Sequence, residues 1–329
     1  MTAFNRSYVL LPSYLIASGI DDPSRIGWLM GIFYLSTFAR PFVSWFIDWK
    51  GFKIVLLSSG ILSILTATGI LVTDPGSFVS LFIWRILAGT AFSFIAVVLT
   101  AYQTLGITGR FRGTSFSVVA ATTNLPFFLV IPFCEVLIKY GYQQIYLMMP
   151  ILFGSGICVF SLFLPPLDVE YKRPKISFWR NFSVVMDSQI RMLLFSVSLF
   201  CSVDAGLLSL VALGNEKGTT VSVFFVAFAV TSVLIRYFGS PLVDYFPRIR
   251  TGWLCGALGG ISIAIFAFPA VNNTFAFVVI GAIYGVSNGL GYPIFLTLIS
   301  DVAPPEHRSQ VAALFWFFMG LAYLLMPVI

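Results

Sequence analysis

Charged residues are scarce in this sequence. Only 10% of the 329 residues are Asp, Glu, Lys or Arg, whereas soluble domains carry roughly 25%. The hydrophobic share is 58%, and a water-soluble fold does not have enough interior to bury that much apolar surface. The composition therefore excludes a soluble enzyme, a disordered chain and a nucleic-acid-binding protein. The net charge of +6 has to be explained by membrane topology instead.

Patterns that bind metals, phosphates or cofactors are also missing. His307 is the one histidine, which excludes a His-ligated metal cluster. The cysteines lie inside apolar runs without Cys-x-x-Cys spacing, which excludes a disulfide framework and a zinc site: Cys134, Cys158, Cys201 and Cys255. No Gly-x4-Gly-Lys-Ser/Thr loop is present, so ATP is not the predicted energy source. We expect no metal and no cofactor, and the lack of clustered acids argues against a membrane enzyme.

Long apolar runs are what the sequence has instead. A membrane-spanning helix needs about 20 apolar residues. One partial run covers 8–17, and ten complete runs begin near Arg25, Ile54, Phe78, Gly113, Ile145, Met192, Thr219, Gly252, Thr274 and Gln310. The sequence predicts an all-α integral membrane bundle with about 11 transmembrane helices. Its expected parts are an N-terminal half at 1–165, a linker at 166–189 and a C-terminal half at 190–329.

The breaks between runs differ in basic charge. Breaks after even-numbered runs, the linker included, hold twelve Lys and Arg, whereas the other side holds three. Basic loops stay in the cytoplasm, so we expect a multi-pass membrane protein with a cytoplasmic linker. Within the linker, apolar residues recur at helical spacing, which fits a short helix on the membrane surface or a plain connection: Ile176, Trp179, Phe182 and Met186.

The two halves repeat at one fixed offset of 196 residues. Five positions match: Arg40 with Arg236, Ser44 with Ser240, Asp48 with Asp244, Gly89 with Gly285, and Arg112 with Arg308. Chance agreement is improbable in a chain with so few charges. Two parallel repeats about an axis along the membrane normal are a known transporter design.

One stretch resembles a family signature. Residues 40–53 (RPFVSWFIDWKGFK) are similar to the loop 2–3 signature of the major facilitator superfamily, Gly-x3-Asp-Arg-x-Gly-Arg-Arg. Asp48, Gly51 and Lys53 fit that signature, while Ser44 replaces its first glycine and Trp49 replaces its first arginine.

Two further stretches resemble the same family, and the resemblance covers essentially the whole chain. Arg85-x3-Gly89 is similar to its second signature, and 304–308 is similar to its loop 10–11. Among its members the chain most resembles bacterial drug- and sugar-efflux proteins. The resemblance implies twelve helices around a central cavity. Because about 11 are predicted here, we expect the first and last helices to be incomplete.

Two charges lie inside the predicted membrane segments. Asp204 is near the middle of the seventh run and Arg85 lies two turns into the fourth. A carboxylate at that depth is costly unless it is paired, hydrated or protonated, and such residues are functional by default. We interpret Asp204 as a proton carrier and Arg85 as its partner across the cavity. The alternatives are a carboxyl satisfied by neighbouring hydroxyls and an arginine that extends to the interface.

Acids at helix ends suggest a cytoplasmic gate. The resemblance implies that Asp48 meets the start of the eleventh helix near Arg308, and that Asp244 meets the start of the fifth near Arg112. Helix N-termini attract carboxylates because their dipoles are partly positive there. We assign six residues to this gate: Asp48, Arg40, Asp244, Arg236, Arg112 and Arg308. Solvated loop acids are the alternative.

Neutral polar side chains within the runs are candidates for the substrate cavity. We select Gln103 and Asn288 first, then Tyr102, Asn124 and Tyr284. Hydrogen bonds between helices are an equally good interpretation of all five.

These observations predict a secondary active transporter that moves a small molecule by alternating access. Protons are the expected coupling ion, the lipid bilayer is the expected environment, and a monomer in a bacterial inner membrane is the expected state. Export is predicted from the resemblance. Uptake by symport is the alternative, because 114–138 lacks the glycines that antiporters of this family often carry. A truncated relative that binds or senses a ligand without transporting it is a second alternative.

Overall fold

The structure is a computed structural model, and it describes residues 2–20, 22–107, 111–165, 186–213, 221–266 and 273–325. Every regular element within these ranges is a helix. The expected all-α fold is therefore confirmed. Residues 166–185 of the linker lie outside the described residues. The expected surface helix falls there, and only its last apolar residue, Met186, is described.

The N-terminal half begins with three short helices and continues with longer ones. They are α1 (Thr2–Ser7), η1 (Tyr8–Leu10), α2 (Leu11–Ala17), α3 (Pro23–Gly31), η2 (Ile32–Ala39), α4 (Arg40–Lys50), α5 (Phe52–Val72), α6 (Phe78–Gly106), α7 (Arg112–Lys139) and α8 (Gln143–Leu162). Asp22 caps α3 by accepting hydrogen bonds from the backbone N–H groups of Ser24 and Arg25. Gly51 separates α4 from α5 with a φ of +83°, a conformation that favours glycine.

The C-terminal half follows the same plan. Its helices are α10 (Ser188–Leu213), α11 (Val221–Phe238), α12 (Leu242–Tyr245), α13 (Arg248–Phe266), α14 (Thr274–Val302), η5 (Pro305–His307) and α15 (Arg308–Leu325). Asp187 accepts a hydrogen bond from the backbone N–H of Gln189 at the start of α10. Asn273 does the same for Ala276 at the start of α14. Polar caps thus mark where these apolar helices begin.

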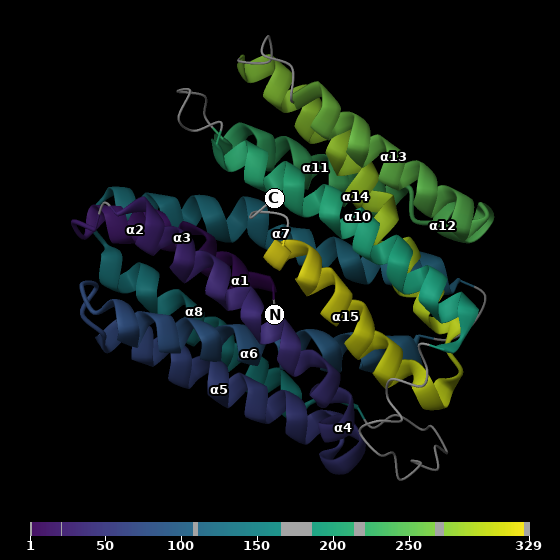
Figure 1. Cartoon of the computed structure of the whole chain (residues 1–329), viewed down its shortest axis with the longest axis horizontal. Helices are drawn as coiled ribbons and strands as arrows, with labels where there is room; N and C mark the ends of the chain where they lie inside the picture. The colour runs from purple at the N-terminus through teal and green to yellow at the C-terminus, as the bar shows by residue number, and fades with distance from the viewer. Residues whose placement is uncertain are drawn as a thin grey trace.

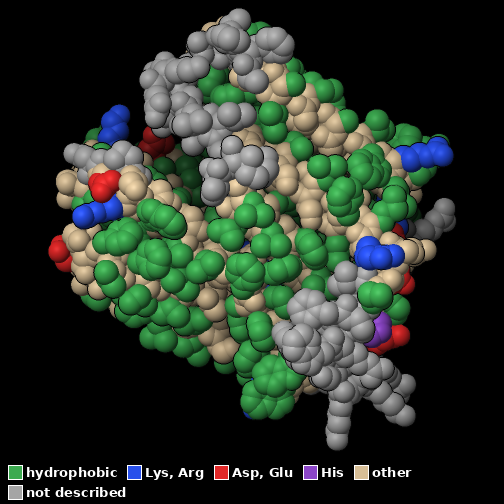
Figure 2. Space-filling view, viewed as in Figure 1, with side chains coloured by type: hydrophobic (Ala, Val, Ile, Leu, Met, Phe, Trp, Pro, Cys, Tyr) green, Lys and Arg blue, Asp and Glu red, His purple; other side chains and the backbone are tan. Residues whose placement is uncertain are grey.

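Nine helical stretches of the described residues are long and apolar enough to cross a membrane. Two more are shorter, 2–17 and Val223–Phe238. The expected count of about 11 transmembrane helices, ten complete and one partial, is therefore not confirmed, although the membrane fold is. Figure 2 shows hydrophobic side chains over the middle of one face, with most charges toward its left and right margins. This distribution suits a bilayer that surrounds the middle of the bundle.

The helices of the two halves lie side by side. In Figure 1, α1 to α8 occupy the lower and left part, α10 to α14 occupy the upper part, and α15 runs in front. Helix α7 packs against α11 and α14 of the other half, and α15 packs against α4 and α6. We call the end of the bundle where α8 ends and α10 begins the linker end. The other end carries the turn after α2.

The sequence repeat recurs in the contacts at the linker end. Nη1 of Arg308 donates to the backbone carbonyl of Thr104 at 2.8 Å. Nη1 of Arg112 donates to that of Ser300 at 3.3 Å. Donors and acceptors are each 196 residues apart. The repeat is therefore a repeat of structure, with each half contacting the other in an equivalent way.

Candidate functional site

A polar cavity lies between the two halves. Nine elements contribute to its wall, and the lining residues are Asn5, Arg6, Tyr34, Arg40, Phe92, Thr123, Asn124, Phe127, Asp204, Phe228, Arg236, Tyr284, Asn288, Tyr292, Trp316, Met319, Gly320 and Tyr323. Its volume is about 110 Å³. A water molecule takes about 30 Å³, and ligand pockets usually measure about 300–1,000 Å³. The cavity is therefore smaller than a typical ligand pocket.

Among the residues that the structure describes, the charges that line this cavity are three arginines and one carboxylate. Arg6, Arg40 and Arg236 face Asp204, which is 8% exposed. Within the described ranges, no ion pair shorter than 4.0 Å involves any of these four residues. Charges inside a membrane protein are expensive and mark ion or substrate pathways. Such an unbalanced set makes this cavity the candidate site.

Arg236 is held in place by oxygen atoms of two helices, α7 and α14. Its Nη1 donates to the Ala120 carbonyl of α7 at 2.6 Å and to Oγ1 of Thr123 at 3.0 Å. Its Nη2 donates to Oδ1 of Asn288 in α14 at 2.9 Å. These hydrogen bonds fix the guanidinium at the boundary of the two halves and leave it without a carboxylate partner.

Arg40 holds the corresponding place in the N-terminal half. Its Nε donates to Oγ of Ser93 at 3.1 Å, and its Nη1 donates to the backbone carbonyl of Trp316. Both Arg40 and Arg236 were expected in the cytoplasmic gate, and the structure corrects this. Helix α4 continues for ten residues beyond Arg40, so Arg40 lies about 15 Å from the linker end.

Arg6 lines the cavity, although the sequence did not suggest it. The carbon atom Cζ of its guanidinium lies 3.9 Å from the centre of the Phe127 ring. Its Nε is buried and has no hydrogen-bond partner among the described residues. Arg6 precedes the first apolar run, which begins at Tyr8, so hydropathy alone makes it a flanking charge.

The expected pair of Arg85 and Asp204 is not formed. Arg85 Nε donates to the Leu29 carbonyl at 3.1 Å, and the guanidinium lies about 5 Å from the rings of Tyr8 and Phe33. Arg85 does not line the cavity, whereas Asp204 does. Helix α6 packs along α3 and η2 at this height, and these helices surround Arg85.

The polar residues proposed for the cavity divide into two groups. Asn124, Tyr284 and Asn288 line it, and Nδ2 of Asn124 also donates to Oγ of Ser232 across the halves at 2.6 Å. Tyr102 and Gln103 do not line it. The Tyr102 hydroxyl donates to the Pro165 carbonyl at 2.9 Å. Helix α6 has 29 residues, more than a bilayer needs, so both residues lie one turn from its linker end.

The structure brings Asp244 to the start of α7. Its carboxylate accepts hydrogen bonds of 2.8 Å from the N–H groups of Gly113 and Thr114 and from the Thr114 hydroxyl. Arg248 donates to it at 2.7 Å. Partial burial alone would raise the pKa of Asp244, but these hydrogen bonds lower it below its usual value. The carboxylate therefore stays ionised and joins the two halves.

Asp301 adds a second acid to this end, which we did not anticipate. It pairs with Arg112 of the other half at 3.2 Å and with Arg248 at 2.5 Å. Arg308 instead donates to the backbone carbonyls of Thr104 and Ser300. The expected contact of Asp48 with the start of the eleventh helix near Arg308 stays a prediction.

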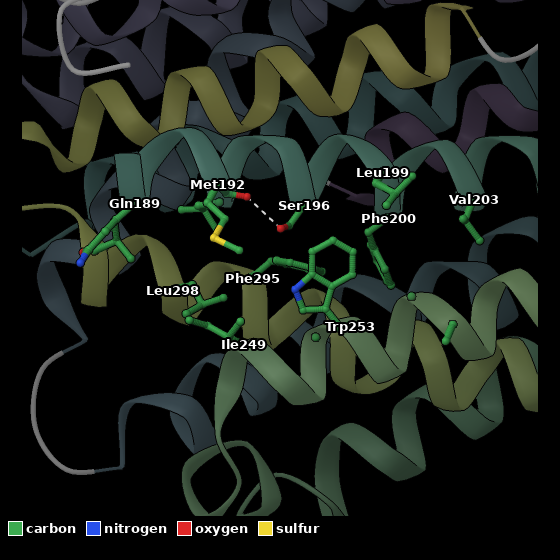
Figure 3. Close-up of a pocket in the computed structure, with 15 residues that line it drawn as sticks. Gln189, Met192, Ser196, Leu199, Phe200, Val203, Ile249, Trp253, Phe295 and Leu298 are labelled. Carbon is green, nitrogen blue, oxygen red and sulfur yellow. Dashed lines mark hydrogen bonds between the residues drawn. The ribbon is translucent and has the colours of Figure 1, made fainter. Parts of the chain in front are cut away.

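A larger groove lies on the outside of the C-terminal half. It measures about 500 Å³ between α10, α13 and α14, where Trp253 and Phe295 lie (Figure 3). Its lining has no charged side chain, and the hydroxyl of Ser196 already donates to the Met192 carbonyl. Half-exposed apolar residues such as Leu199 and Ile249 form its walls. This surface suits acyl chains, so the smaller polar cavity is the better candidate.

Comparison with known structures gives similar folds throughout the chain. The human organic anion transporter MFSD10 superposes with a TM-score of 0.78 at 15% identity, over 98% of this chain and 82% of that chain. A bacterial homologue of the iron transporter ferroportin, in an outward-facing state, gives 0.75 at 14% identity, over 99% and 88%. The proton:xylose symporter XylE gives 0.71 at 14% identity, over 99% and 83%. Identities this low establish the fold alone.

The sequence comparison defines the family. No curated protein matches the sequence. The sequence model described as Major Facilitator Superfamily matches residues 1–327, nearly the whole chain. The helical membrane fold, the repeat of 196 residues and this match lead to one conclusion: the chain belongs to the major facilitator superfamily of membrane transporters.

Proposed function

We propose that this protein is a secondary active transporter that moves a small molecule by alternating access. The observation that carries the proposal is the charged cavity between two halves that meet through discrete polar contacts. At 110 Å³ the cavity is too small for most solutes, so transport requires the halves to rock apart around it. We infer a monomer as the working unit, because both halves of the site come from one chain.

The linker end is the proposed cytoplasmic gate. Asp244 accepts hydrogen bonds from the start of α7, and Arg112 pairs with Asp301. These contacts cross between the halves and would all break when this end opens. The excess of basic residues at this end supports a cytoplasmic position. We accordingly propose the inner membrane of a bacterium, with the present state closed to the cytoplasm.

Asp204 is the proposed proton carrier. It is the one acid among the described residues that line the cavity, and Arg6 and Arg236 line the same cavity. The hydrogen bonds and ring contacts of Arg85 in the described part of the chain are to α3, η1 and η2 of its own half. We therefore assign Arg85 to the packing of α6 and replace it, as the partner of Asp204, with Arg6 and Arg236.

Two directions of coupling are candidates. Export in exchange for protons is the expectation from the resemblance to efflux proteins. Uptake by symport is favoured by the charge of the cavity, because a proton on Asp204 would leave three arginines to attract an anion. In that case proton and substrate strengthen each other's binding and move together.

The test is substrate-driven proton movement in sealed liposomes that contain this chain and a pH dye. The panel consists of drugs, sugars, carboxylates and amino acids under an imposed pH gradient. We expect a dye signal with at least one class, and its sign distinguishes symport from exchange. Ligand binding without a signal across the panel would contradict the proposal and would favour a binding protein that does not transport.

A further inference from the structure

We propose that the substrate is an organic anion, with a negatively charged head that binds Arg6 and an aromatic or apolar body that packs against the rings of the cavity. This inference rests on the proposed function, since it takes the cavity as the transport site. It specifies the class of substrate, which neither the fold nor the family defines.

The first argument is the balance of charge. The charged residues that line the cavity in the described part of the chain are three arginines and one aspartate, and together they carry a net charge of +2 when all four are ionised. Burying a charge without a counter-charge is costly. Asp204 can compensate only one of the three cations. A monovalent anion lowers this net charge to +1, whereas a cation raises it and a neutral sugar leaves it unchanged.

The second argument is the state of Arg6. The guanidinium groups of Arg40 and Arg236 already donate to protein oxygens. Arg6 donates no hydrogen bond within the described residues, and its Nε is buried. Guanidinium presents its donors in a planar fork that matches a carboxylate. Phe127 supports this group from one side at 3.9 Å, so Arg6 is a fixed and unused anion-binding group.

The third argument is the rest of the wall. Eight of the eighteen lining residues named above are aromatic, and Phe92, Phe228 and Trp316 come from three different helices. Aromatic rings supply large apolar contacts at low entropic cost. A compact carboxylate with an aromatic body therefore suits the aromatic part of this wall.

The anion and the carboxylate of Asp204 would compete for the same arginines. Binding of the anion should therefore favour the protonated form of Asp204. The other charged or titratable groups around it are Arg6, Tyr34, Arg40, Cys201, Arg236, Tyr284, Tyr292 and Tyr323. Between about pH 5 and 7 arginines stay positively charged, whereas tyrosines and thiols stay protonated and neutral. Asp204 is therefore the group whose protonation changes with pH. Anion affinity should rise as the pH falls.

The test is isothermal titration of the purified full chain in lipid nanodiscs. Benzoate, 4-phenylbutyrate and indole-3-acetate are compared with their amides and with the corresponding amines. We expect at least one acid to bind, and we expect its amide and amine to bind at least about tenfold more weakly. The amide and the amine lack the negative charge that binds the buried arginine. Arg6→Gln should reduce acid binding about tenfold or more, whereas the exposed control Arg25→Gln should not.

Amides or amines that bind as well as the acids would overturn the proposal, as would no binding of any acid or equal binding by the Arg6→Gln variant. A variant that fails to fold is recognised by its thermal unfolding, and Arg6→Lys then provides the second measurement, with intermediate affinity expected. Liposomes separate the two proposals. If a cation or sugar drives proton movement and no acid does, the substrate class fails but transport stands. If acids bind through Arg6 yet nothing moves, transport fails but the class stands.

Discussion

Arg40 and Arg236 lie 196 residues apart and make equivalent contacts in opposite directions. Nη1 of Arg40 in α4 donates to the backbone carbonyl of Trp316 in α15, and Nη1 of Arg236 in α11 donates to that of Ala120 in α7. Trp316 and Ala120 are also 196 residues apart. Each arginine therefore joins its own half to a helix of the other half beside the central cavity.

Arg236→Lys should damage both stability and transport. Lysine keeps the charge but cannot reach Ala120, Thr123 and Asn288 together, because it lacks the planar fork. We expect a loss of about 2–3 kcal/mol in unfolding free energy and a fall in transport of about tenfold or more. Denaturant unfolding and liposome flux measure the two effects. The exposed Arg25→Lys is the control, and equal behaviour of both variants would refute the role given to Arg236.

Asp244→Asn should open the linker end. The amide loses the charge that attracts Arg248 and the start of α7. A loss of about 2 kcal/mol shifts the equilibrium toward the open form about 30-fold. The measurement is the rate at which a thiol reagent modifies Thr104→Cys, a buried position at this end, in a chain whose native cysteines are replaced by alanine.

Asp187→Asn is the matched control for that experiment. Asp187 is also an acid at the linker end, but it caps α10 of its own half through Gln189 and Ile190. Its replacement should leave the modification rate of Thr104→Cys unchanged. A similar increase in both variants would show that general loosening, and not the contact between the halves, controls access.

The gate should not respond to pH in the physiological range. The pKa of Asp244 is lowered in the folded protein, so its stabilising effect is complete above the unfolded value of about 3.9 and is lost only as the pH falls through the lowered value. In an Asp204→Asn background, the modification rate of Thr104→Cys is divided by the rate for the denatured chain at the same pH, because only the thiolate reacts. This ratio should stay constant from about pH 5 to 8. A ratio that changes near pH 6 would contradict this assignment.

Gly113→Ala should disturb the same contact sterically. An added Cβ would lie 2.5 Å from Oδ1 of Asp244 and 2.7 Å from Cγ1 of Val243, so α12 has to move away from α7. We expect faster modification of Thr104→Cys without loss of helix content. Gly256→Ala, where no atom lies within 4 Å, should have no effect. If the two alanine variants behave alike, close approach at Gly113 is not needed for closure.

The sequence predicted contacts where the repeat supplied two copies of a pattern. Asp244 at the start of α7 follows from the repeat and the family signature together. Arg6 and Asp301 have no charged counterpart at the offset of 196 residues, so the repeat could not reveal them. Hydropathy could not reveal Arg6 either. An arginine that flanks a membrane helix and one that lines a cavity can have the same neighbours in the sequence.

The misplaced residues show a second limit. Arg85 and Asp204 were matched by depth in the membrane, and Tyr102 and Gln103 by polarity within an apolar run. The depth of a residue along its helix follows from the sequence. The rotation of the helix about its axis, and the helices that pack against it, do not. Arg85 faces Tyr8 and Phe33 because α6 packs on η2 and α3, a packing that only the assembled bundle defines.

The most direct test of proton coupling is Asp204→Asn in liposomes, measured in two ways on the same preparation. One assay follows exchange of labelled substrate at equal concentrations, and the other follows accumulation driven by a pH gradient. We predict that exchange persists while accumulation and its pH dependence disappear, because the carrier of the proton is gone. Accumulation with an unchanged pH dependence in the Asp204→Asn variant would contradict the account.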